Sequence, residues 1–115
     1  MEELNKILEL DKRIRFVAKI SYGGEFLDSV FRSDLSLHIG AEQQKSMGIH
    51  VSIMADTHRR VDNSYGASRV SITLRPKMIT VLFYAEDDLY SISLDACANY
   101  PELVKKIGHE LSIPI

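Results

Sequence analysis

The sequence predicts an α+β domain built on a single five-stranded antiparallel sheet. Three observations support this class. Hydrophobic residues recur at helical spacing near both ends and in the middle of the chain, and they alternate with polar residues in two groups between those helices. Short turn signals separate the strands within each group, so neighbouring strands are expected to pair antiparallel. The predicted order of elements is α-β-β-α-β-β-β-α.

The chain has 115 residues, of which 45% are hydrophobic and 26% are charged. This length is typical of one compact domain, and the composition is that of a globular protein rather than of a disordered or fibrous one. We therefore expect residues 1–115 to form a single domain.

The first helix is predicted over Glu2–Asp11, because its apolar residues follow helical spacing and no glycine or proline interrupts them. Its apolar stripe comprises Leu4, Ile7 and Leu8. The spacing changes to two over Arg15–Ser21, which predicts a strand with one buried face. That face would hold Phe16, Ala18 and Ile20.

A turn is expected at Tyr22-Gly23-Gly24-Glu25, since a Gly-Gly pair between two strand-like runs is typical of a hairpin. The second strand of this hairpin is predicted over Glu25–Phe31, and its less regular pattern indicates a bulge. A polar connection at 32–40 follows.

The longest predicted helix runs from about Ala41 to about Asn63. Gly48 lies inside it, although glycine lowers helix stability by roughly 1 kcal/mol relative to alanine. The polar cluster at 62–66 is expected to end the helix, with Gly66 in the left-handed conformation found at many helix ends.

Three further strands are predicted in the second half of the chain. The first spans Arg69–Arg75, shows the clearest alternation, and ends at a turn containing Pro76. The second spans Met78–Tyr84 and is apolar on both faces, so we expect it inside the sheet with both faces covered. The third alternates from Tyr90 to Leu94 after the acidic turn at 86–88.

The last helix is expected to begin at Asn99, a favoured cap residue, with Pro101 in the first turn and Glu102 three residues after the cap. Its apolar stripe consists of Leu103, Val104, Ile107 and Leu111.

The central helix carries apolar residues on two sides. One side is a stripe spaced by four and three residues, namely Met47, Val51, Met54, His58, Val61 and Tyr65. Ile49 and Ile53 lie nearly opposite this stripe. One side would pack on the sheet and the other on a second copy of the chain, although loops or terminal helices of the same chain could also cover both sides. The predicted dimer or partner interface comprises Met47, Ile49, Val51, Ile53, Met54, His58 and Val61.

Composition argues against several classes of function. With a formal net charge of −2, the chain has no strongly basic field, so we expect no nucleic-acid partner. Its longest apolar run is far shorter than the roughly 20 residues of a membrane-spanning helix, and the acidic start does not resemble a signal peptide. The single Cys97 cannot form an internal disulfide, which fits a cytoplasmic protein.

No combination of residues predicts a catalytic, metal or cofactor site. His50, Met54 and His58 follow helical spacing, but the two imidazoles would lie about 11 Å apart along the axis. Cys97 and His109 lack the accompanying residues of a thiol nucleophile and its base. Five tyrosines are expected as half-buried sheet and junction residues, with a ligand pocket as the alternative: Tyr22, Tyr65, Tyr84, Tyr90 and Tyr100.

The order of elements resembles the roadblock/dynein light chain-like superfamily. The resemblance rests on Ile14-Arg15-Phe16-Val17-Ala18, on Tyr22-Gly23-Gly24-Glu25 and on Asp88-Leu89-Tyr90-Ser91-Ile92-Ser93. The segments at 7–16 and 98–104 are more closely similar to small single-domain archaeal proteins of unassigned function.

The resemblance implies a roadblock-like, profilin-like sandwich that forms a homodimer, with the central helices paired and the two sheets joined edge to edge. It also implies a non-catalytic platform that binds or regulates a small Ras-like GTPase or scaffolds a larger complex. Related PAS-like domains bind small ligands between sheet and helix, and such a sensor is the alternative.

Overall fold

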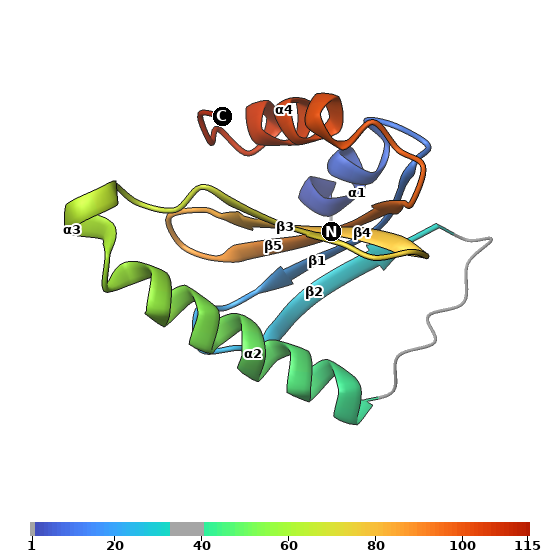
Figure 1. The fold of residues 1–115 in the computed structure, drawn as a ribbon. Coiled ribbons are helices and arrows are strands. Elements are labelled where there is room, and N and C mark those ends of the chain that lie inside the picture. Colours follow the sequence, from blue (N-terminus) through green and yellow to red (C-terminus); the bar gives the residue numbers. More distant parts are fainter. Residues whose placement is uncertain (1, 33–40) are drawn as a thin grey trace.

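The computed structural model describes residues 2–32 and 41–115 and confirms the α+β class (Figure 1). Its first five elements are α1 (Glu2–Leu8), β1 (Ile14–Ile20), β2 (Phe26–Phe31), α2 (Ala41–Arg59) and the short α3 (Asp62–Tyr65). The remaining elements are β3 (Val70–Leu74), β4 (Met78–Tyr84), β5 (Leu89–Asp95) and α4 (Tyr100–Glu110). Apart from Arg32, the polar connection predicted at 32–40 lies outside the described residues.

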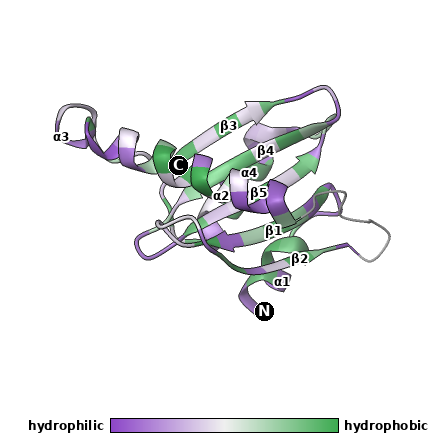
Figure 2. Cartoon of the chain, turned by 90° about the horizontal axis from the view of Figure 1, so that it is seen from below, coloured by the Kyte–Doolittle hydropathy of each residue, from purple (hydrophilic) through white to green (hydrophobic). Residues whose placement is uncertain are grey.

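The strands form one sheet in the order β2-β1-β5-β4-β3, and every neighbouring pair is antiparallel. The hairpin β1–β2 and the meander β3–β4–β5 meet where β1 pairs with β5, with Val17 opposite Ile92. β4 lies inside the sheet, as its apolar pattern predicts, while β5 is the middle strand. Figure 2 shows hydrophobic residues along the strands and hydrophilic ones in the turns.

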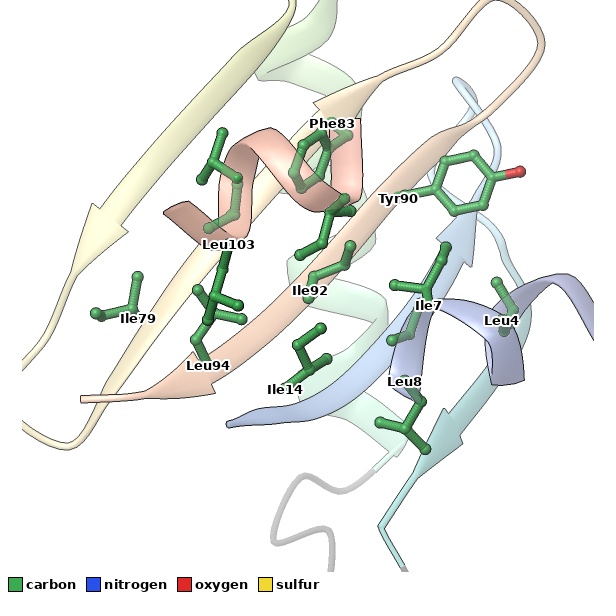
Figure 3. Packing of buried hydrophobic residues seen from close by; sticks show 14 of the residues in the cluster. Leu4, Ile7, Leu8, Ile14, Ile79, Phe83, Tyr90, Ile92, Leu94 and Leu103 are labelled. Carbon is green, nitrogen blue, oxygen red and sulfur yellow. The ribbon is translucent and has the colours of Figure 1, made fainter. Parts of the chain in front are cut away.

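Helices cover both faces of the sheet. α1 and α4 lie on one face and α2 lies across the other (Figure 1). The larger core cluster lies beneath α1 and α4 and includes Leu4, Ile7, Phe83, Ile92 and Leu103, all at most 1% exposed (Figure 3). The smaller cluster lies beneath α2.

β1 is buried on both faces, so the prediction of one buried face is wrong. Ala18 and Ile20 belong to the cluster beneath α2, as expected, with Phe16 packed against it. Val17 points the other way and is fully buried beneath α1 and α4. The cause is the place of β1 between β2 and β5, where helices cover both faces.

Two irregularities in pairing adjust the sheet. Ile20 pairs with Phe26 and Lys19 with Asp28, which leaves Leu27 as the extra residue of the bulge predicted in β2. A second shift, between Ile14 and Phe16, turns Ile14 to the same face as Val17.

The central helix ends earlier than predicted. α2 ends at Arg59 rather than near Asn63, and residues 62–65 form the separate α3. The amides of Arg60 and Val61 donate to carbonyls three residues back, at 3.3 and 3.1 Å, so the last turn tightens and the α-helical pattern stops. Gly66 follows α3 instead, and its φ of 84° is positive as predicted, but its ψ of 163° lies outside the left-handed helical conformation.

Both terminal helices differ in detail from the prediction. α1 ends at Leu8 instead of Asp11. Asn99 is the N-cap residue of α4, but its side chain makes no capping hydrogen bond and instead lies 3.5 Å from Glu102 Oε2. None of the helices in the described residues is long and apolar enough to cross a membrane.

Candidate interaction surface on α2 and β3

The inner side of α2 is fixed to the sheet and to the β1–β2 turn. Gly48, Val51 and Ala55 are buried along this side. At Gly48 the helix backbone meets the backbone of Gly24 in the turn, with no room for a side chain between them. Ser52 Oγ donates to the backbone carbonyl of residue 22 at 2.9 Å. These contacts orient the remaining sides of α2 relative to the sheet.

A groove runs between α2 and the β3 side of the sheet. It has a volume of about 410 Å³, opens to the surface, and is mostly apolar along the helix, where Met47 and Met54 form its wall. Ser71 and Thr73 of β3 line the opposite side, and Leu82 lies in its floor. α2 therefore leaves the β3 side of its sheet face uncovered. We call this feature the helix–strand groove.

The outer side of α2 points away from the sheet. Ile49 is 52% exposed and Ile53 is 61% exposed, one helical turn apart. Both residues thus lie on the side of the helix opposite the buried one, as their helical spacing in the sequence indicates. Large aliphatic side chains at such exposure are candidates for contact with another protein.

β3 is an edge strand of the sheet formed by the described residues. Arg75 and Met78 exchange backbone hydrogen bonds at 3.0 and 3.4 Å, and Thr73 faces Thr80. Since inward and outward backbone groups alternate along an antiparallel edge, the N–H and C=O of Ile72 point away from β4. β3 thus presents unused backbone donors and acceptors next to the helix–strand groove.

Two apolar side chains of β3 are more exposed than its alternation suggests. Ile72 is 42% exposed and Leu74 is 61% exposed, on the face that carries α1 and α4. Alternation correctly places them on one face, but it does not reveal that this face lies beyond the reach of α4. The sequence does place both residues in an outer strand of the predicted meander. This position indicates exposure only once the order of the strands in the sheet is known.

The structure separates the seven predicted interface residues into groups. Met47 and Met54 meet in the helix–strand groove, Ile49 and Ile53 lie on the outer side, and Val51 is buried on the inner side. His58 lies in the last turn of α2, and Val61 lies beyond the end of this helix. The role of all seven residues in an interface stays a prediction.

His58 contributes to the inner side rather than to an apolar stripe. Its Nδ1 lies 2.6 Å from Ser68 Oγ, and its ring stacks on Tyr84 with centroids 5.4 Å apart. Val61 is exposed in the turn after α2, and Tyr65 is 84% exposed in α3, so the predicted stripe does not continue through them.

The structure places several of the residues that were considered for chemistry. Cys97 is exposed, and no group of three or more His, Cys, Asp or Glu residues suited to a metal occurs in the parts of the chain described, 2–32 and 41–115. In the acidic turn, Asp88 lies 3.6 Å from Lys19 Nζ, while Glu86 and Asp87 are exposed. Arg60 Nη2 lies 3.3 Å from Asp56 Oδ2, in an exposed ion pair at the end of α2.

Of the five tyrosines, Tyr22 and Tyr84 both line a second hollow at the end of α2. Burial raises the pKa of each phenol. Tyr90 is buried beneath α1 and donates to Glu3, and its pKa is raised well above its usual range, mainly by burial and then by that bond. Both hollows beside α2 open to the surface, whereas the sensor alternative predicts an enclosed pocket.

Comparison with solved structures identifies the fold. The gliding protein MglB from Thermus thermophilus superimposes with a TM-score of 0.74 at 14% identity, over 96% of this chain and 84% of that one. A structure described as MglB with tetrameric arrangement gives a TM-score of 0.77 at 13% identity, over 96% and 80% of the two chains. The roadblock/LC7 domain from Streptomyces avermitilis gives 0.69 at 10% identity, over 96% and 87%.

No protein-family model and no curated protein matches the sequence. The closer similarity expected to archaeal proteins stays a prediction. The element order, the sheet topology and these superpositions together establish that the chain has the roadblock/LC7 fold.

Proposed function

We propose that the chain is a non-catalytic, homodimeric regulatory or scaffold module that acts in the cytoplasm. Its partner would be a small Ras-like GTPase or another signalling protein. The observation that carries this proposal is the adjacency of an open strand edge, β3, and the helix–strand groove beside it.

The strand edge supports antiparallel pairing with a second copy. A two-fold axis beside Ile72 would place β3 against β3 of the second copy, and the outward N–H and C=O groups would then bond across the axis. The two sheets would become one continuous sheet. Exposed Ile72 and Leu74 would come next to their counterparts, which removes apolar surface from water.

The same axis brings the two α2 helices together. Each helix borders the open side of its own groove, so the methionines of one copy would enter the groove of the other. Met47 and Met54 suit this role because flexible thioether side chains fill irregular space. A two-fold interface uses the same surface patch of both copies. The methionines meet this condition, because they line the groove of their own copy and would fill the groove of the other.

Ile49 and Ile53 would stay exposed after this pairing, since they point away from the sheet and the groove. The dimer would therefore display two such pairs on one surface. We assign this surface to the regulatory partner. The tetrameric arrangement named for one MglB structure supports the ability of this fold to associate.

Sedimentation of the wild type and two single variants tests the dimer. In Met54→Asp a carboxylate would be buried in the apolar contact, so this variant is expected to sediment as a monomer. Ile53→Asp is the matched control, one residue away on the outer side, and should remain dimeric. A monomeric wild type at micromolar concentration, with all variants folded by circular dichroism, would refute self-association.

The partner is tested separately, with the Ile53→Asp dimer as bait beside the wild type. Purified small GTPases from the native cell, loaded with GDP or a GTP analogue, would be titrated into each. We expect the wild type to bind and Ile53→Asp to lose at least tenfold in affinity. Equal binding by both proteins would remove the outer side of α2 from the proposal.

A further inference from the structure

An arginine borders the edge strand β3 at each end. Arg69 directly precedes the strand, Arg75 directly follows it, and both residues are exposed. Glu86 lines a hollow together with Arg69, but within residues 2–32 and 41–115 neither of the two guanidinium groups forms an ion pair with a carboxylate. The open strand edge is therefore flanked by two positive charges that these residues do not neutralise.

The surroundings of Arg75 favour an anion. Arg75 and His50 both line the helix–strand groove. In the part of the chain that the structure describes, the other side chains lining this groove are apolar or carry hydroxyls, and none is acidic. Asp95, at the end of β5, is already paired, since its Oδ1 lies 3.3 Å from Arg15 Nε. A groove with one sign of charge attracts ligands of the opposite sign.

The proposed dimer brings a second arginine to the same place, and this step rests on that proposal. With the two-fold axis beside Ile72, Arg75 of one copy lies opposite Arg69 of the other. The backbone groups of both arginines bond toward β4, to Met78 and Tyr84, so across the axis the two form a non-hydrogen-bonded pair, in which side chains lie closest. Like charges directly opposite each other destabilise a sheet. The axis repeats the pair, so one lies at each end of the joined strands.

We propose that a phosphate-type dianion binds at each end of the joined β3 strands, between Arg75 of one copy and Arg69 of the other. Each planar guanidinium can donate two parallel hydrogen bonds to phosphate oxygens. His50 and Thr73 line the groove together with Arg75 and can supply further donors. Because the site is complete only in the dimer, a bound dianion would shift the equilibrium from monomer to dimer.

Sedimentation equilibrium of the full chain in two buffers tests the site. One buffer contains about 10 mM inorganic phosphate at about pH 8, and the other contains sodium chloride at the same ionic strength and pH. We expect the dissociation constant of the dimer to be at least fivefold lower in phosphate. The same dissociation constant in both buffers would overturn the dianion site and leave the dimer standing. A monomer in both buffers at micromolar concentration would refute the dimer, and the site with it.

Arginine variants separate repulsion from an ordinary stabilising contact. Arg75→Gln removes the like-charge pair, so in chloride its dimer should be several-fold tighter than that of the wild type and should not respond to phosphate. Arg69→Gln should behave in the same way, and it decides the matter if Arg75→Gln is unfolded by circular dichroism. Arg60→Gln is the matched control, because Arg60 is exposed beyond the end of α2 and pairs with Asp56. A weaker dimer of the folded variants in chloride, or a retained response to phosphate, would contradict the assignment.

Acetate and glycerol 2-phosphate define the chemistry of the bound group. Acetate is a singly charged anion, and at the same ionic strength it should tighten the wild-type dimer much less than phosphate does. An effect of acetate equal to that of phosphate would overturn the assignment to a dianion. A response to glycerol 2-phosphate as large as that to inorganic phosphate supports a small phosphate ester as the ligand, whereas a response to inorganic phosphate alone supports the free ion.

Discussion

The backbone of Gly24, in the β1–β2 turn, packs directly against the backbone of Gly48 in the middle of α2. A Cβ on Gly24 would lie 2.6 Å from the carbonyl oxygen of Gly48, and Gly24 also has a positive φ of 92°. The two glycines thus let a hairpin turn and a helix approach more closely than any side chain would allow. This contact sets the height of α2 above the sheet.

Replacing Gly48 by alanine tests this contact. Alanine normally stabilises a helix interior by about 1 kcal/mol relative to glycine. Here its Cβ would overlap the carbonyl of Gly24, so we expect a net loss of about 1–3 kcal/mol in the free energy of unfolding. Urea unfolding measures this loss. Gly23→Ala is the control, because its nearest neighbour would be an ordinary contact at 3.6 Å, and equal stability of Gly48→Ala and wild type would show that α2 can shift.

The open edge of β3 is tested by Ile72→Pro. Proline removes an outward backbone donor while the bonds between β3 and β4 remain, so the monomer should fold and the dimer should weaken at least tenfold. Ile72→Ala keeps the donor and separates the side-chain effect. Analytical ultracentrifugation gives the dissociation constants. A dimer of Ile72→Pro as tight as that of Ile72→Ala would exclude pairing through this edge.

Arg32 ties the end of α1 to the sheet. Its guanidinium donates to the carbonyls of Leu8, Asp11 and Ile14 at 2.7, 2.6 and 2.7 Å. We expect Arg32→Lys to lose about 2 kcal/mol, since one ammonium cannot reach all three acceptors in the same geometry. Hydrogen exchange should show faster opening of α1 than of α4. Uniform loss of protection across both helices would contradict a local role.

We expect Asp11 to make the stability of the folded state depend on pH in the acid range. Hydrogen bonds from the side chain and backbone of Arg13, at 2.8–2.9 Å, hold the pKa of Asp11 well below its usual range. The folded state therefore favours the ionised carboxylate, and this contribution is present above the unfolded pKa of about 3.9 and fades as the pH falls toward the folded value. Asp11→Asn should lower the melting temperature by a few degrees at pH 7.

The difference in melting temperature between wild type and Asp11→Asn should narrow below about pH 4. Thermal melts at pH 7, 5, 3 and 2 check this trend. Asp56→Asn removes an exposed pair and should change stability by less than about 0.5 kcal/mol. A constant difference between wild type and Asp11→Asn at all four pH values would rule out the linkage.

Local patterns in the sequence are sufficient for most of the elements. Alternation locates β3, a run that is apolar on both faces locates β4, and the apolar stripe of α4 is confirmed by the burial of Leu103, Val104 and Ile107. These predictions succeed because the spacing of side chains depends only on neighbours in the chain.

Features that depend on the order of the strands in the sheet could not be predicted from local sequence patterns. β1 is buried on both faces because β5 returns beside it, and Ile72 is exposed because β3 lies at an edge. From the sequence alone, Gly48 only lowers the expected stability of the helix. The structure shows why a glycine stands there: the backbone of Gly24, in the β1–β2 turn, packs against it. The hollow at the end of α2 likewise unites Tyr22, Asp62 and Tyr84 from distant segments, which local sequence patterns do not bring together.

The pairing of β1 with β5 also has a consequence for the order of folding events. The N-terminal hairpin and the C-terminal meander can each begin to form locally, but they become one sheet only when β5 reaches β1. Such non-local pairing slows folding, because the intervening chain must be closed first. During synthesis, β1 would therefore lack its β5 neighbour until residues 89–95 have been made. Until then its unpaired backbone edge and apolar side chains are open to non-native contacts.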